Sequence, residues 1–157
     1  MIKQIPYGLT DFGRIQKENY YYVDKTMFIE KIEMQPSYLF LIRPRRFGKS
    51  LTLAMLEAYY DVRYADQFDE LFGHLYIGQH PTPIHNQFLI MRFNFSEVSS
   101  NVNEVEESFR LHCCGKLSDF VYRYEHLLGK DIWNVLDEKT QADPGAFLSR
   151  SEERRVG

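Results

Sequence analysis

The stretch Tyr38–Tyr60, which reads YLFLIRPRRFGKSLTLAMLEAYY, decides the predicted fold. It opens with the apolar run Tyr38–Ile42, whose lack of polar alternation is typical of a β-strand buried on both faces. Its second half repeats apolar residues at three- and four-residue steps, which predicts a helix packed on a sheet; these residues are Leu51, Ala54, Met55 and Ala58. The turn Arg43–Ser50 is therefore predicted to join a central strand to a helix.

That turn ends in Gly48-Lys49-Ser50, the closing half of the phosphate-binding pattern G-x-x-x-x-G-K-[ST]. A helix N-terminus at this point offers unpaired backbone N–H groups and a partial positive charge to an anion. Gly48 would let the backbone approach the anion closely. Lys49 would lie between the β- and γ-phosphates, and the Ser50 hydroxyl would hold Mg²⁺.

Arg43 stands where the pattern has its first glycine, so RPRRFGKS is a degenerate Walker A loop. The alternative is a chance tripeptide at a helix start, where glycine and serine are common. The position of the tripeptide between an apolar run and an amphipathic segment favours the phosphate loop, because the motif requires that context.

Three strings of this sequence resemble the AAA-ATPase-like family of bacterial ATP-binding proteins: RPRRFGKSL at 43–51, YYYVDKTMFIEKI at 20–32 and IPYGLTDF at 5–12. The similarity extends from about Ile5 to about Trp133. The resemblance implies an α/β, P-loop NTPase-like fold, with a partial parallel sheet flanked by helices. It also implies ATP and Mg²⁺ as ligands, and Arg43 as an accepted variant of the first glycine. Many members of the family continue into a restriction-endonuclease-like nuclease domain, so such a downstream domain is an implied partner.

The candidate nucleotide-binding residues follow the loop; they are Arg45, Arg46, Phe47, Gly48, Lys49, Ser50 and Leu51, with Ser50 also the candidate Mg²⁺ ligand. The resemblance adds Tyr22, Val23 and Asp24 as candidate contacts on the adenine side, since the segment before the loop strand lies near the adenine in many P-loop ATPases. The alternative for these three residues is structural, with the aromatic ring in the core and Asp24 at a helix start.

ATP hydrolysis also requires an acidic motif at the end of a strand. The segment Ile132–Glu138, IWNVLDE, has the right spelling with Asp137 and Glu138, but Asn134 interrupts the apolar run and the apolar residues fit a helix face. In the resembled family the motif comes later than this chain reaches. We therefore expect nucleotide binding without appreciable hydrolysis by this chain alone. The alternative function is a non-hydrolysing module that binds nucleotide or an acidic partner.

Further elements are predicted from periodicity and from helix-ending glycines. Gln87–Phe95 is a second predicted strand, and Met1–Asn19 is predicted to be an irregular arm. Helices are predicted at Thr26–Glu33, Ser50–Tyr60, Ala65–Phe72 and Val102–Gly129, with a shorter helical piece at Ile132–Leu136.

Composition limits the function classes. The 157 residues are 44% hydrophobic, which suits a single domain with a real core. A net charge of −3 gives no general reason to expect nucleic acid, and the cations around Lys49 are predicted to form a phosphate pocket. The sequence has no apolar run of membrane-spanning length and no signal-peptide core at its N-terminus, so we expect a cytoplasmic location.

Neither cysteine nor histidine spacing points to a metal site other than nucleotide-bound Mg²⁺. Cys113 and Cys114 are adjacent and are expected to be reduced, packed thiols. Residues 1–148 are predicted to be the N-terminal part of a P-loop domain. Residues 149–157, which end in SEERRVG, resemble a translated adaptor sequence and are predicted to be a non-native or disordered tail, so that the chain is a fragment truncated at its C-terminus.

Overall fold

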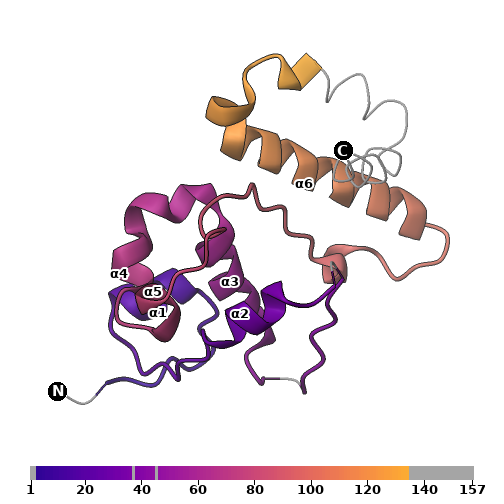
Figure 1. Cartoon of the computed structure of the whole chain (residues 1–157). Coiled ribbons are helices and arrows are strands. Elements are labelled where there is room, and N and C mark those ends of the chain that lie inside the picture. The colour runs from indigo at the N-terminus through magenta and orange to yellow at the C-terminus, as the bar shows by residue number, and fades with distance from the viewer. Residues whose placement is uncertain (1–2, 37, 45, 135–157) are drawn as a thin grey trace. The chain divides into compact units, whose positions relative to one another are not determined.

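In the computed structural model, residues 3–36, 38–44 and 46–134 are described, and their regular elements are helices (Figure 1). In chain order these are α1 Phe12–Lys17, α2 Phe28–Glu33, α3 Lys49–Tyr60, the 3-10 helix η1 Val62–Gln67, α4 Phe68–Phe72, α5 Tyr76–Gln79, the 3-10 helix η2 Phe95–Glu97 and α6 Val105–Leu128. The chain divides into two compact units, Met1–Ile90 and Met91–Gly157. The boundary predicted between residues 148 and 149 lies outside the described residues.

The predicted α/β fold with a partial parallel sheet is wrong. No β-strand occurs in the described part of the chain, where one isolated parallel bridge joins Asp61 to Phe88. The predicted strand Tyr38–Ile42 lies at the surface instead, with Phe40 and Ile42 89% and 90% exposed. The apolar run has the composition of a buried strand without the structure of one.

Among the described residues, no second strand pairs with this run. The predicted second strand, Gln87–Phe95, is also wrong, and its first residues contact the C-terminal end of α3. The Phe88 N–H donates to the Tyr60 carbonyl at 2.9 Å, and the Val62 N–H donates to the Phe88 carbonyl at 3.0 Å. Since a ladder needs hydrogen bonds between adjacent strands, these two bonds beside the end of α3 form an isolated bridge and no sheet.

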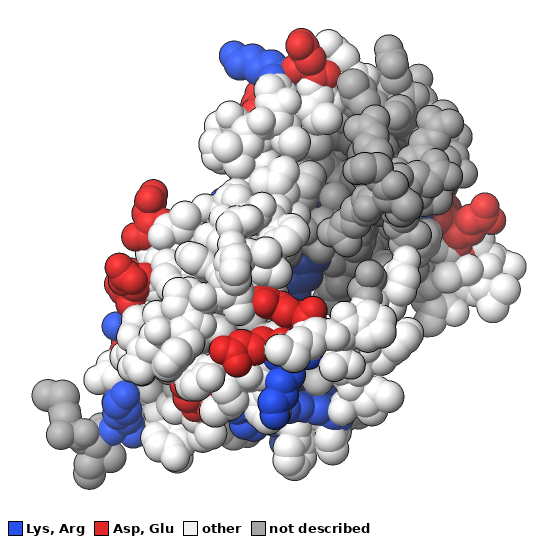
Figure 2. Space-filling view, viewed as in Figure 1, with Lys and Arg blue, Asp and Glu red and all other residues white. Residues whose placement is uncertain are grey.

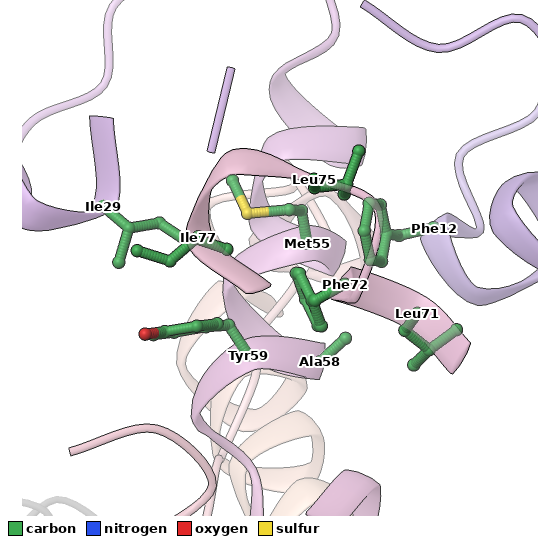
Figure 3. Close-up of a cluster of buried hydrophobic side chains, with 9 residues drawn as sticks. All are labelled: Phe12, Ile29, Met55, Ala58, Tyr59, Leu71, Phe72, Leu75 and Ile77. Atoms are coloured by element: carbon green, nitrogen blue, oxygen red, sulfur yellow. The ribbon is translucent and has the colours of Figure 1, made fainter. Parts of the chain in front are cut away.

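Helix α3 lies at the centre of the core of the first unit (Figure 3). The predicted helix Ser50–Tyr60 is confirmed, and its apolar stripe faces inward: Met55 and Ala58 are buried, while Leu51 and Ala54 pack on the cluster. The cluster also contains Tyr59 of α3 and Leu75, the N-cap residue of α5. Helices α1, α2, α4 and α5 contribute the other side chains, which are Phe12, Ile29, Leu71, Phe72 and Ile77. Burial of each such side chain contributes roughly 1.5–3 kcal/mol to the free energy of unfolding.

Polar groups at the C-terminal end of α3 connect it to α2 and to the following loop. Tyr59 is fully buried, and its hydroxyl accepts the Thr82 N–H at 2.8 Å. The Glu33 carboxylate of α2 accepts the Tyr60 hydroxyl at 2.9 Å and the Thr82 hydroxyl at 2.8 Å. These bonds satisfy phenol groups whose burial would otherwise be unfavourable.

The predicted irregular arm Met1–Asn19 contains a helix, so that prediction is wrong over α1. The Asp11 side chain caps α1 by accepting the Arg14 N–H at 2.9 Å, and Phe12 and Ile15 are buried. The signal was present in the sequence, because aspartate is a favoured N-cap residue. The short helix places Phe12 in the core beside α3 and α4 (Figure 3).

The other predicted helices of the first unit are confirmed with changed limits. Thr26–Glu33 forms α2 from Phe28, and Ala65–Phe72 is divided between η1 and α4. In the second unit, Val102–Gly129 forms α6, which ends before Gly129 at φ 82°. None of the helices among the described residues has the length and apolar character needed to cross a membrane.

Helix α6 supplies the core of the second unit. Its buried residues are Cys113, Leu117, Val121 and Tyr124. Met91, Phe120, Ile132 and Trp133 pack against Leu117 and Val121. Residues 132–134 are helical, in line with the shorter helical piece predicted there, and the rest of that piece lies outside the described residues.

Candidate functional site

The first unit contains a pocket of about 480 Å³ beside the start of α3. Three stretches that are distant in sequence line it. They are Tyr21–Val23 with Lys25, the apolar residues Leu39–Leu41 with Arg43, and the start of α3 with Phe47, Gly48, Leu51, Thr52 and Met55; Pro6, Phe28 and Ile32 complete the lining. The pocket thus adjoins the predicted phosphate loop.

The backbone of the loop takes two left-handed residues. Gly48 is the N-cap of α3 at φ 74° and ψ 22°, and Arg46 has φ 67°. A left-handed conformation is free of strain for glycine but costs about 1–2 kcal/mol for a residue with a Cβ. A Cβ at Gly48 would meet no atom within 4 Å, so the glycine is required for its φ angle and the space beside it is open.

The first turn of α3 leaves N–H groups available to a ligand. No side chain among the described residues caps this helix, and the N-cap is a glycine. The Thr52 hydroxyl donates to the Gly48 carbonyl at 2.9 Å, while Lys49 and Ser50 are exposed. Unpaired N–H groups at the positive end of a twelve-residue helix are suited to an anion.

Two hydrogen bonds cross the loop. The Lys49 ammonium donates to the Arg43 carbonyl at 3.0 Å, and the Arg43 guanidinium donates from Nη1 to the Phe47 carbonyl at 3.3 Å. Figure 2 shows a group of Lys and Arg side chains on the first unit beside the segment between α2 and α3, bordered by Asp and Glu side chains.

Tyr22 and Val23, two of the candidate adenine-side residues, line the same pocket as Gly48 and Leu51. Tyr22 is half-buried and packs edge-on against Phe12, with ring centroids 5.5 Å apart. Burial, and after it the charge of Asp24, raises the pKa of the Tyr22 phenol to about 12. Tyr22 therefore stays neutral at physiological pH.

Asp24 has a different place, away from the pocket lining. Its carboxylate accepts the Tyr76 N–H at 2.8 Å and both the N–H and the hydroxyl of Thr26, at 2.8 and 2.7 Å. Burial acts to raise the pKa of Asp24, but these hydrogen bonds outweigh it and hold the pKa below its ordinary value. The buried Thr26 hydroxyl in turn accepts the Ile77 N–H at 3.1 Å, so this part of the YVDKT string anchors α5.

The structure brings most of the predicted loop residues together at α3. Phe47, Gly48 and Leu51 line the pocket, Lys49 and Ser50 lie in the first helical turn, and Arg46 lies in the left-handed turn before it. Arg45 lies outside the described residues, as do Asp137 and Glu138. Sequence reasoning missed Phe28 and Leu39–Leu41 as lining residues, because their apolar character predicted burial in a core or sheet.

The cysteines and histidines of the second unit form no metal centre within the described ranges. Cys113 is buried and Cys114 half-buried, and both are free thiols. Burial, and then the neighbouring Cys114, raises the pKa of the Cys113 thiol, which disfavours a reactive thiolate. His112 lies 3.5 Å from the Glu97 carboxylate within the second unit.

Comparison with known proteins gives one family match. The model of the AAA-ATPase-like family, described as "Predicted AAA-ATPase", matches residues 6–154. A protein of Azotobacter chroococcum mcd 1, described as "Uncharacterized protein in vnfD 5'region", is 49% identical over 55 residues, which are 34% of this chain and 11% of that protein. This chain thus matches a small part of the length of that relative. No solved structure matches the chain significantly.

Proposed function

Since this chain belongs to the AAA-ATPase-like family of predicted ATPases, we propose that it binds a nucleoside triphosphate, ATP with Mg²⁺, through the degenerate Walker A loop RPRRFGKS. The phosphates lie over the first turn of α3, and the base enters the adjoining pocket. The family match supports nucleotide binding in general, while the position of the site on this loop is our proposal.

One observation carries the proposal: the left-handed Gly48, the exposed Lys49 and the uncapped first turn of α3 all adjoin a pocket of about 480 Å³. A phosphate needs N–H donors and a cation, and a base needs an apolar cleft. The pocket lining of Tyr22, Val23 and Leu51 is of that apolar kind. All of these groups belong to the first unit.

The roles follow from side-chain chemistry. Lys49 exchanges its bond to the Arg43 carbonyl for one to the β- and γ-phosphates, which makes it the point charge of the site. Ser50 supplies a hydroxyl to the nucleotide-bound Mg²⁺. Backbone N–H groups of residues 46–50 donate to the phosphate oxygens. Tyr22 and Val23 contact the adenine, whereas Asp24 is engaged by Tyr76 and Thr26.

We further propose that this chain binds nucleotide without turning it over. Hydrolysis needs a carboxylate on the Mg²⁺ side and a group that orients the attacking water. Residues 132–134 are helical, which argues against a strand-borne acidic motif at Ile132–Glu138. A cytoplasmic location remains an expectation from the sequence pattern, and a nuclease-like domain in a longer protein remains an expectation from the family resemblance.

The test is a calorimetric titration of the 157-residue chain with ATP, in the presence and in the absence of Mg²⁺. Lys49→Ala should lose at least about tenfold in affinity, because a hydrogen bond to a charged group contributes roughly 1.5–3 kcal/mol. Lys130→Ala, an exposed lysine in the second unit, is the matched control and should bind like the unchanged chain. Equal ATP affinity in the Lys49 and Lys130 variants would remove the central claim.

A further inference from the structure

Arg43 occupies the position of the first glycine in the phosphate-loop pattern, yet the backbone there does not call for glycine. Between residues 38 and 60, the described residues with positive φ are Arg46 and Gly48. Arg43 has a conformation open to any L-residue. An arginine in place of the first glycine therefore causes no backbone strain at this position. Its side chain can form contacts that glycine cannot form.

The side chain and the carbonyl of Arg43 each make one of the two bonds across the loop. Its guanidinium donates to the Phe47 carbonyl at 3.3 Å, and its own carbonyl accepts the Lys49 ammonium at 3.0 Å. Arg43 thus contacts both the residue before Gly48 and the residue after it. It is half-buried and lines the pocket with Phe47 and Gly48.

From this arrangement we propose that Arg43 is a positioning residue of the phosphate loop, whose guanidinium holds the Phe47 carbonyl in the geometry that receives the phosphates, and whose own carbonyl holds the Lys49 ammonium until the phosphates bind it. We call these two hydrogen bonds the clasp. The inference rests on the proposed nucleotide binding. In this role the Arg43 side chain makes a charged hydrogen bond across the turn, which a glycine at this position could not make.

Two physical effects follow from the clasp. A carbonyl oxygen that faces an anion repels it, and a guanidinium bound to the Phe47 carbonyl offsets that partial negative charge. The left-handed turn at Arg46 and Gly48 is strained at its non-glycine residue, and such a turn persists only where surrounding contacts hold it. The bond from the Arg43 guanidinium to the Phe47 carbonyl spans Arg46, and the bond from Lys49 to the Arg43 carbonyl spans both Arg46 and Gly48.

The clasp is tested without nucleotide by NMR of the full chain labelled with ¹³C-carbonyl phenylalanine and ¹⁵N-glycine. Phe-Gly pairs occur at Phe12-Gly13, Phe47-Gly48 and Phe72-Gly73, so the first and third are internal references. In Arg43→Gly the carbonyl signal of Phe47 should move upfield as its donor is lost, and in Arg43→Lys it should move less. Lys25→Ala removes a cation from the same pocket and should leave the signal in place.

The positioning role is tested by ATP affinity in the same variants. Arg43→Gly restores the general pattern, yet it should bind ATP about tenfold more weakly, and Arg43→Lys should recover most of that loss because it keeps a charged donor. ATP binding by Arg43→Gly as tight as by the unchanged chain would overturn the proposal, as would an unmoved Phe47 carbonyl. If the unchanged chain bound no ATP, the proposed function would fail together with the role of Arg43 in it. The Phe47 signal would still report whether the clasp exists.

Discussion

Gly48 is the single residue on whose backbone the loop depends most. It holds the left-handed N-cap position of α3, and no neighbouring atom restricts the size of its side chain. The requirement for glycine is therefore conformational, in contrast to a glycine that is needed for close packing. This distinction can be tested with a second glycine that also has open space around it.

Gly48→Ala should lose affinity for ATP by up to about tenfold, because a left-handed alanine costs about 1–2 kcal/mol and the loop relaxes away from the phosphate geometry. Gly115→Ala is the matched control, since Gly115 lies within α6 and a Cβ there also meets no atom within 4 Å. That change should raise the free energy of unfolding by about 0.4–1 kcal/mol. ATP titration measures the affinity of both variants, and urea unfolding measures their free energies of unfolding. Equal changes of both quantities in Gly48→Ala and Gly115→Ala would contradict the conformational argument.

The cations before Gly48 are expected to assist the site without defining it. Replacing Arg45 and Arg46 together by alanine should weaken ATP binding less than Lys49→Ala does, since side chains beside the loop add to a site that the backbone and Lys49 define. Competition titration with ATP ranks the two variants. A larger loss in the double variant than in Lys49→Ala would reverse these roles.

At the level of elements, α5 depends on a residue far from it in sequence. The helix has no side-chain cap of its own, and the Asp24 carboxylate accepts the N–H of its first residue, Tyr76. The adjoining Thr26 hydroxyl accepts the N–H of Ile77. The string YVDKT thereby connects one side of the pocket, where Tyr22 and Val23 lie, to the helix that packs Ile77 into the core.

This connection makes the stability of the first unit dependent on pH. The pKa of Asp24 is lowered in the folded chain, so its contribution is fully present above the unfolded value of about 3.9 and is lost as the pH falls through the folded value. Asp24→Asn should therefore flatten the fall of the melting temperature below about pH 4. Asp66→Asn, at an exposed aspartate of η1, is the control. Identical melting profiles of the unchanged chain and Asp24→Asn between pH 3 and 6 would refute this role.

At the level of the whole chain, the first unit combines a packed core with an exposed apolar run. Phe12, Tyr59 and Phe72 are fully buried, whereas Phe40 and Ile42 are almost fully exposed. Exposed apolar patches of this kind favour association or aggregation. The exposure of this run also distinguishes the structure from the predicted sheet, in which Tyr38–Ile42 would be buried on both faces.

A pair of identical substitutions makes that contrast measurable. Ile29→Ala should lower the free energy of unfolding by about 2–5 kcal/mol, because Ile29 is fully buried in the cluster around α3. Ile42→Ala should change it by no more than about 0.5 kcal/mol, because Ile42 is 90% exposed. Urea unfolding gives both values. A loss at Ile42 as large as that at Ile29 would show that the run is buried in solution.

Local sequence patterns were sufficient for α3, for α6 and for the turn before α3, but they did not predict α1, α5 or η2. The periodic spacing of Leu51, Ala54, Met55 and Ala58 predicted α3 and its buried face, and the spacing along Val102–Gly129 predicted α6. Gly48-Lys49-Ser50 predicted a loop at a helix start, and the structure has a left-handed Gly48 at that place. These features depend on residues a few positions apart, whose interactions the sequence itself specifies.

Contacts between distant segments decided the rest. The apolar composition of Tyr38–Ile42 and Gln87–Phe95 predicted strands, but a strand exists only with a partner, and the Phe88 end of the second segment pairs with α3 instead. The same holds for Asp24, because only tertiary folding brings its carboxylate to the Tyr76 N–H of α5. Arg43 was a mismatch to a pattern, and only the folded loop brought its guanidinium to the Phe47 carbonyl. Hydrogen bonds of this kind depend on where the chain returns in space, which no local pattern encodes.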